Sequence, residues 1–182
     1  MNDSTLKNQA DLSLEKAKEV ILQHIPKEEI LSIYVKGSYV QNELQPESDV
    51  DVVVILKDEK YLPEIYELTN KFGKDIVPNF QIVAYTLKEL QTGEKASNRI
   101  KNTTPVSLFV KHMSQLPLLY GSKPDGQLFT RTDKKDLTSH ISVFNNRFFP
   151  DFYNGKFKFN ELVKQVLWLT EREQRTLGNT PE

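Results

Sequence analysis

The chain has 182 residues, enough for one domain with a small addition and for a core that needs neither disulfides nor structural metals. Hydrophobic residues make up 38% of it and charged residues 27%, as in an ordinary globular protein, and a net charge of −1 disfavours long nucleic acids as partners. The absence of cysteine excludes thiolate catalysis, disulfides, zinc fingers and iron–sulfur clusters.

The first stretch of the chain is polar and does not predict a secretory leader. No apolar run approaches the length of a membrane-spanning helix, so we expect a cytoplasmic protein with no membrane partner. Residues 1–11 are expected to be frayed. From Leu12 to Ile25 apolar residues recur at helical spacing, with Ser13 as the N-cap, and Pro26 ends the pattern.

Two predicted strands then frame a short polar connection. Residues 30–36 are rich in Ile, Val and Tyr and predict the first strand. Residues 49–56, DVDVVVIL, become continuously apolar after their acidic start, which is typical of a strand buried on both faces. Gly37-Ser38 follows the first strand, and a turn containing Pro46 leads to the second.

The rest of the chain predicts one more core strand and then mostly helices. A helix is expected over residues 60–72, a strand over 79–86, a helix over 105–115 and a short strand over 117–121. Two helices are expected over 133–148 and 159–177. Aromatic residues crowd the segment between them, and we expect most of these side chains in the core together with Trp168: Phe144, Phe148, Phe149, Phe152, Tyr153, Phe157 and Phe159. The order indicates an α/β or α+β fold with a helical C-terminal portion.

Asp49 and Asp51 are the first candidates for chemistry. Residues two apart on a strand point to the same face, so the two carboxylates are neighbours at the start of the buried strand. Two like charges this close favour either protonation of one group or a bridging cation, and paired oxygen ligands suit Mg²⁺. Taken alone, an Asp-x-Asp pair is more typical of two solvated acids at a strand edge.

Gly37 and Ser38 form the second candidate element. Glycine after a strand lets a phosphate approach the backbone, where turn N–H groups and the serine hydroxyl can bind it. By itself Gly-Ser is also a common strand-ending turn. Together with Asp49 and Asp51 it is more specific, because one element supplies donors to phosphate oxygens and the other holds a metal that bridges them.

The segment VKGSYVQNELQPESDVDVVVIL resembles the hallmark of the DNA-polymerase-β-like nucleotidyltransferase superfamily, in which Gly-Ser is followed after about ten residues by Asp-hydrophobic-Asp. It looks most like the bacterial branch of aminoglycoside adenylyltransferases and minimal nucleotidyltransferases, and LPLLYG resembles a Leu-Tyr-Gly segment of antibiotic-modifying members. The resemblance implies a nucleotidyltransferase core at residues 1–121, with a small mixed sheet flanked by helices, and a helical extension at 122–182. It also implies that Gly37 and Ser38 contact the triphosphate, and that Asp49 and Asp51 hold Mg²⁺.

The sequence departs from this family at one position. A third carboxylate is expected in the next core strand, where the best-aligned residue is Gln81, which carries no charge and cannot take a proton. Three interpretations stay open: Asp75 serves instead, two carboxylates suffice with a base supplied by the substrate, or the domain binds nucleotide without turnover. Glu89 is the nearest acid downstream.

The leading hypothesis is an enzyme that moves a nucleoside monophosphate, AMP from ATP, to a hydroxyl of a small molecule or protein. The alternative is an antitoxin-like or catalytically silent regulatory protein that binds nucleotide and acts on a protein partner. Lys36 and the basic residues Lys95, Arg99 and Lys101 are secondary candidates for phosphate contacts, with solvated surface positions as the simpler interpretation. The sequence identifies neither the acceptor nor the oligomeric state.

Overall fold

A computed structural model describes residues 3–97 and 104–178 of the chain. These residues fall into two compact units, Met1–Phe129 and Thr130–Glu182, which we describe separately. The first contains a small mixed sheet with flanking helices and the second is helical, which confirms the predicted fold class. The sequence places a boundary after Gly121, whereas the first compact unit extends to Phe129, whose N–H donates to the Leu90 carbonyl at 2.7 Å.

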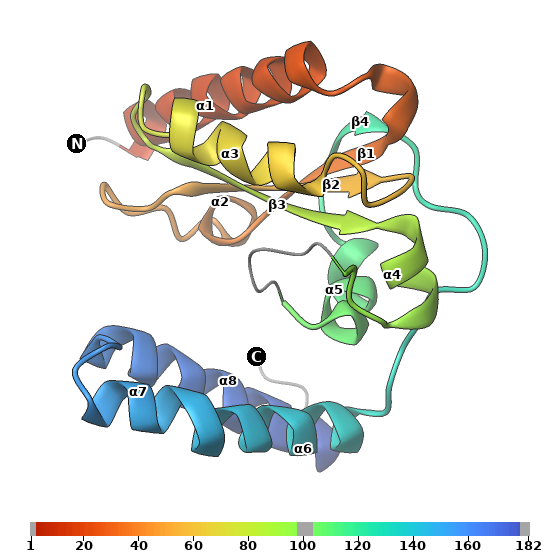
Figure 1. Ribbon diagram of the computed structural model, residues 1–182. Helices are drawn as coiled ribbons and strands as arrows, with labels where there is room; N and C mark the ends of the chain where they lie inside the picture. The colour runs from red at the N-terminus through yellow and green to blue at the C-terminus, as the bar shows by residue number, and fades with distance from the viewer. Residues whose placement is uncertain (1–2, 98–103, 179–182) are drawn as a thin grey trace. The chain divides into compact units, whose positions relative to one another are not determined.

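The sheet has four strands in the order β3-β2-β1-β4 (Figure 1). Its strands are β1 (Ile30–Lys36), β2 (Val50–Leu56), β3 (Phe80–Thr86) and β4 (Leu118–Gly121). Strand β1 is antiparallel to both β2 and β4, whereas β2 and β3 run parallel. The connection from β1 to β2 contains the short helix α2 (Ser38–Gln41), and η1 (Lys27–Glu29) precedes β1. The strongly apolar β2 is therefore central, as its sequence predicts.

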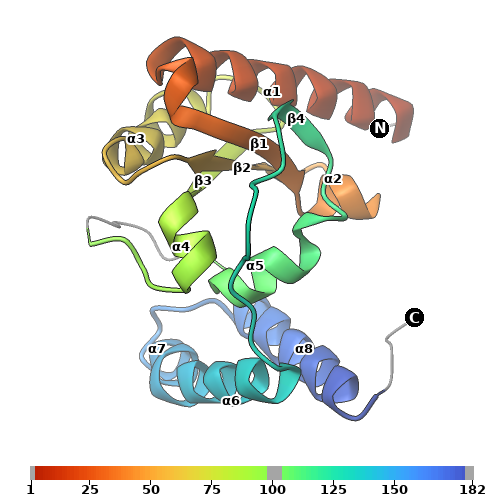
Figure 2. The same ribbon diagram turned by 90° about the vertical axis from the view of Figure 1, so that its right-hand side faces the viewer.

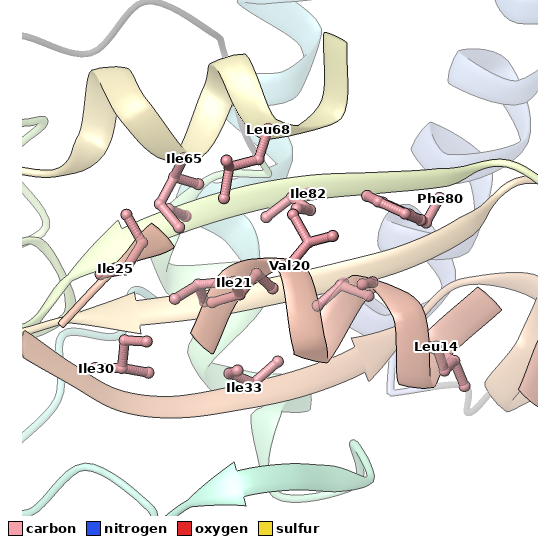
Figure 3. Close-up of a cluster of buried hydrophobic side chains, with 14 of the residues drawn as sticks. Leu14, Val20, Ile21, Ile25, Ile30, Ile33, Ile65, Leu68, Phe80 and Ile82 are labelled. Atoms are coloured by element: carbon pink, nitrogen blue, oxygen red, sulfur yellow. The ribbon is translucent and has the colours of Figure 1, made fainter. Parts of the chain in front are cut away.

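One face of the sheet is covered by α1 (Asp3–His24) and α3 (Leu62–Phe72), as Figure 1 shows. Alternate strand residues point to this face and meet the apolar stripes of both helices in the larger buried cluster. Part of that cluster is drawn in Figure 3 and includes Leu14, Val20, Ile21, Ile25, Ile30, Ile33, Ile65, Leu68, Phe80 and Ile82. Packing against α1 and α3 therefore fixes the positions of the strands from this face of the sheet.

Helix α1 begins at Asp3, so the expectation of a frayed segment over residues 1–11 is wrong from residue 3 onward, and residues 1–2 lie outside the described part of the chain. Leu6 and Ala10 extend the helical spacing of Leu14 toward the N-terminus, and both are buried. Ser13, expected to be the N-cap, lies inside the helix, where its fully buried hydroxyl donates to the Pro78 carbonyl at 2.6 Å. Tertiary contacts along its buried stripe therefore stabilise the first turns of α1.

The opposite face of the sheet carries a smaller buried cluster that includes residues of α4 (Leu87–Thr92) and α5 (Val106–Met113). Figure 2 shows these two helices below the sheet. Tyr34, Val53, Ile55 and Tyr85 supply its strand side chains, and Tyr85 stacks on Phe109 with 4.5 Å between ring centroids. Because strand residues alternate, these side chains lie on the same face as Asp51. The end of this face that carries Asp51 is polar.

Strand β4 ends at Gly121, whose φ of 77° lies in the region that favours glycine. A side chain there would meet the backbone carbonyl of Leu31 on the neighbouring strand. The glycine of the Leu-Tyr-Gly segment therefore lets the chain leave β4 in a tight turn while its backbone stays in close contact with β1. The N–H of Ser122 then donates to the Leu31 carbonyl at 3.1 Å.

The second unit consists of a helical run packed on one further helix. The run comprises α6 (Asp133–Val143), the π-helical turn η2 (Phe144–Phe148) and α7 (Phe149–Tyr153), and its partner is α8 (Phe159–Thr176). The first predicted helix thus continues five residues beyond 148, and the widened turn precedes Pro150, which lacks an N–H and crowds the preceding turn. His140 on α6 and Gln165 on α8 pair at 3.2 Å.

The prediction that the aromatic segment is mostly core is wrong for several residues of the second unit. Phe149, Tyr153 and Phe159 are exposed, as is Trp168. Phe148 does stack on Phe157, with 5.3 Å between ring centroids. Across the described part of the chain, no helix combines the length and apolarity needed to span a membrane.

We predict that Ser13→Ala lowers the free energy of unfolding by about 1–2 kcal/mol, because it removes a buried hydrogen bond and leaves the Pro78 carbonyl without this donor. Urea denaturation followed by far-ultraviolet circular dichroism measures the change. Ser122→Ala is the matched control, since Ser122 is exposed and its replacement should shift the value by less than about 0.5 kcal/mol. Equal effects of the two substitutions would contradict the role of the buried hydroxyl.

Candidate functional site

A row of three polar side chains crosses the sheet near the start of β2. Lys36 on β1 pairs in register with Asp51 on β2, and Asp51 pairs in register with Gln81 on β3. Paired residues of neighbouring strands point to the same face, so the three side chains lie side by side. The flanking row, formed by Val35, Val52 and Ile82, points into the opposite, packed core.

Asp49 joins this row from the residue position just outside β2. The Gln81 side-chain amide donates to Asp49, with 2.5 Å between Nε2 and Oδ2. Asp49 and Asp51 are both partly exposed, and Gln81 is exposed, so the group is open to solvent at this end of the sheet. The structure therefore brings Asp49, Asp51 and Gln81 together, with Lys36 one strand away.

Gly37 places the backbone directly beside Asp51. Its φ of 78° and ψ of −155° fall in a region that only glycine populates readily, and it immediately precedes α2. A Cβ added there would lie 2.5 Å from Oδ2 of Asp51. The absence of a side chain thus allows the turn and the carboxylate to approach each other closely.

Helix α2 starts at Ser38, next to Asp51 through the Gly37 turn. The Gly37 carbonyl accepts from Val40 N at 3.0 Å, and the Ser38 carbonyl accepts from Glu43 N at 2.9 Å. Asn42 ends the helix in the left-handed conformation, with a φ of 57°. Because α2 is a single turn, its position depends on contacts with neighbouring elements.

Such a contact ties α2 to α1. The Tyr39 hydroxyl donates to Oδ1 of Asp11 at 2.6 Å. This hydrogen bond, together with burial and the negative charge of Asp11, raises the pKa of Tyr39 to about 12. No sequence motif singled out Asp11 or Tyr39, because the contact joins residues 28 positions apart.

The other acids considered from the sequence do not join Asp49 and Asp51. Glu89 is buried, and its carboxylate accepts from the N–H groups of Thr86 and Ala96 at 2.9 and 2.8 Å, which caps α4 and orders the chain beyond it. Asp75 is exposed in the turn before β3. Among the described residues, no three His, Asp or Glu side chains are arranged to hold a metal ion.

The secondary basic candidates are only partly described. Arg99 and Lys101 lie outside the described residues. Lys95 is exposed in the segment that follows α4. Lys36 is the basic candidate that the sheet itself positions next to Asp51.

The donor set fits a hard divalent cation. Two carboxylates supply charged oxygens, and the side-chain-free turn at Gly37 brings backbone directly beside Asp51. Magnesium in proteins is commonly held by one or two carboxylates and completes its shell with water and phosphate oxygens. The arrangement is therefore suited to a cation that arrives together with an anionic ligand.

Comparison with known proteins gives one family match. Residues 15–101 match the family model described as Polymerase beta, Nucleotidyltransferase. The matched segment includes every residue of the predicted site: Gly37, Ser38, Asp49, Asp51 and Gln81. No curated protein matches the sequence significantly.

Solved structures give weaker likenesses. A Sulfolobus solfataricus protein to which nucleotidyltransferase activity is ascribed aligns with a TM-score of 0.36 and 18% identity, covering 46% of this chain and 76% of that one. A toxin-antitoxin crystallised with AMP-PNP aligns with a TM-score of 0.42 and 17% identity, over 90% of this chain and 93% of that one. A mutant of the toxin-antitoxin MntA-HpeT aligns with a TM-score of 0.41 and 16% identity, also over 90% of this chain and 93% of that one. Scores this low support no inference about activity or partners.

We predict that Gly37→Ala lowers the free energy of unfolding by about 1–3 kcal/mol, because the backbone conformation is strained for any residue with a Cβ. It should also push against the Asp51 carboxylate. Urea denaturation of Gly37→Ala, Asp51→Ala and the double variant separates the two causes. In the Asp51→Ala background the glycine substitution should cost less, and strictly additive effects would contradict the close approach of Gly37 and Asp51.

Proposed function

We propose a function from one premise: residues 15–101 belong to the polymerase beta, nucleotidyltransferase family. On this premise the chain binds a nucleoside triphosphate with Mg²⁺ and transfers its nucleoside monophosphate to a hydroxyl group. The donor is ATP and the acceptor is a small molecule, in a cytoplasmic setting. The observation that carries the proposal is the close approach of the side-chain-free turn at Gly37 to the Asp51 carboxylate, with Asp49 beside it.

Each part of this site has a separate task in binding. The turn at Gly37 and Ser38 lets phosphate oxygens approach the backbone next to Asp51. Asp49 and Asp51 would hold Mg²⁺, which when bound offsets the charge of the phosphates and orients them. Lys36, in register with Asp51, adds a positive charge on the same face of the sheet.

The transfer itself is a displacement at the α-phosphorus. The acceptor oxygen forms a bond to that phosphorus, the bond to the bridging oxygen breaks, and pyrophosphate leaves. Catalysis of this step rests on positioning and on electrostatic stabilisation of the phosphates. Gln81 cannot accept the proton of the hydroxyl, so that proton passes to solvent or to a basic group of the acceptor.

A second candidate function is nucleotide binding without transfer, in a regulatory protein that acts on a protein partner. The observation that favours it is the amide of Gln81 beside Asp49, where a carboxylate could have served as the general base. Calorimetry with ATP and Mg²⁺ measures binding, and an assay of pyrophosphate release with hydroxyl acceptors measures transfer. Tight binding without pyrophosphate release would favour this second candidate over the enzyme.

We predict that Asp51→Asn weakens binding of MgATP and reduces pyrophosphate release by more than about 100-fold, since even outer-shell partners of a metal contribute about 10–100-fold in affinity or activity. Titration calorimetry gives the binding constant without knowledge of the acceptor. Asp58→Asn is the matched control, because Asp58 is an exposed acid in the turn at the other end of β2, where it accepts from Lys60 N. Unchanged MgATP binding and turnover in Asp51→Asn would refute the assignment.

A further inference from the structure

We propose that Gln81 limits this site to a single divalent cation. The inference rests on the proposed nucleotide-binding function and concerns the number of ions that accompany the nucleotide. It follows from three observations: where Gln81 lies, what it does to Asp49, and which other ligands the surrounding elements offer.

Gln81 occupies the position from which a third carboxylate would reach the other two. It pairs in register with Asp51 on the neighbouring parallel strand, and its amide donates to Oδ2 of Asp49. Both carboxylates are thus within reach of the residue-81 side chain. A charged side chain here would complete a set of three acids on adjacent strands, whereas the amide leaves two.

The Gln81 amide also uses one carboxylate oxygen of Asp49 as a hydrogen-bond acceptor. Its N–H group donates to Oδ2 of Asp49, so one oxygen of that carboxylate is oriented toward β3 by a neutral donor. A cation on this side would meet the positive end of the amide dipole. The hydrogen bond therefore orients Asp49 for a cation on the side facing Asp51 and opposes a second cation on the side facing Gln81.

Neighbouring elements supply no replacement within the described residues. Glu89 accepts from the backbone N–H groups of Thr86 and Ala96, and Asp75 lies in an exposed turn. Over residues 3–97 and 104–178, no third acid or histidine completes a metal-binding group with Asp49 and Asp51. A second divalent ion would have to rely largely on the phosphates and water.

Electrostatic repulsion between two divalent ions also disfavours a second ion at this site. Two metal ions in such two-metal sites lie about 3.5–4 Å apart and need bridging anionic ligands to offset their mutual repulsion. Two divalent cations repel each other four times as strongly as two unit charges at the same separation. Among the protein's own groups, two carboxylates offset one divalent ion and Lys36 on the adjacent strand adds positive charge, so a second ion would depend on the phosphates alone for its charge balance.

The test counts bound Mn²⁺, a paramagnetic substitute for Mg²⁺, on the full chain saturated with a non-hydrolysable ATP analogue. Electron paramagnetic resonance measures free Mn²⁺ and hence the number of ions bound per chain. We expect one ion for the wild type, one for Gln81→Leu and two for Gln81→Glu. The leucine variant is the matched control, because it removes the amide without adding charge, and Gln81→Leu should weaken Mn²⁺ binding by about 10–100-fold if the amide orients Asp49.

The thermal stability of each variant gives a second readout that does not depend on activity. The melting temperature of Gln81→Glu should be lowered without Mn²⁺ and should rise more with Mn²⁺ than that of the wild type, because only the ion relieves repulsion among three carboxylates. Two ions on the wild type or one ion on Gln81→Glu would each overturn the inference. Absence of nucleotide and Mn²⁺ binding in every variant would instead overturn the proposed function, and this inference with it.

Discussion

The pairing register of β2 with its two neighbours is the constraint on which the candidate site depends. Val50, Val52 and Val54 face α1 and α3, so the residues between them must face the other side of the sheet. A slip of one residue would turn Asp51 into the packed core and a valine toward solvent, which is very costly. The same apolar contacts that stabilise the domain therefore also determine where Asp51 lies relative to β1 and β3.

Local sequence patterns predicted much of this arrangement. The strands were predictable because Ile, Val and Tyr runs bounded by turn residues carry a strong signal, and the shared face of Asp49 and Asp51 follows from strand periodicity alone. The side chain that adjoins them was harder to predict, since the register between β2 and β3 is set by packing across the sheet. Gln81 is beside Asp49 because Asp51 pairs with residue 81.

Other features could not be read from the sequence because they depend on distant contacts. The first turns of α1 look polar, yet Leu6 and Ala10 are buried. In the second unit the reverse holds: Phe149 and Tyr153 look like core residues but are exposed. A helical run with one packed partner buries only one side of each helix, so side chains on the outer sides stay exposed within the unit.

The hydrogen bond between Tyr39 and Asp11 connects the site to the beginning of the chain. Because α2 is a single turn that starts at Ser38, a shift of α1 changes the position of the backbone next to Asp51. A chain shortened to begin at Leu12 would keep Gly37, Asp49 and Asp51 and still lose the acceptor that anchors α2. A truncation meant to isolate the candidate site therefore has to retain Asp11 if it is to preserve this contact between α1 and α2.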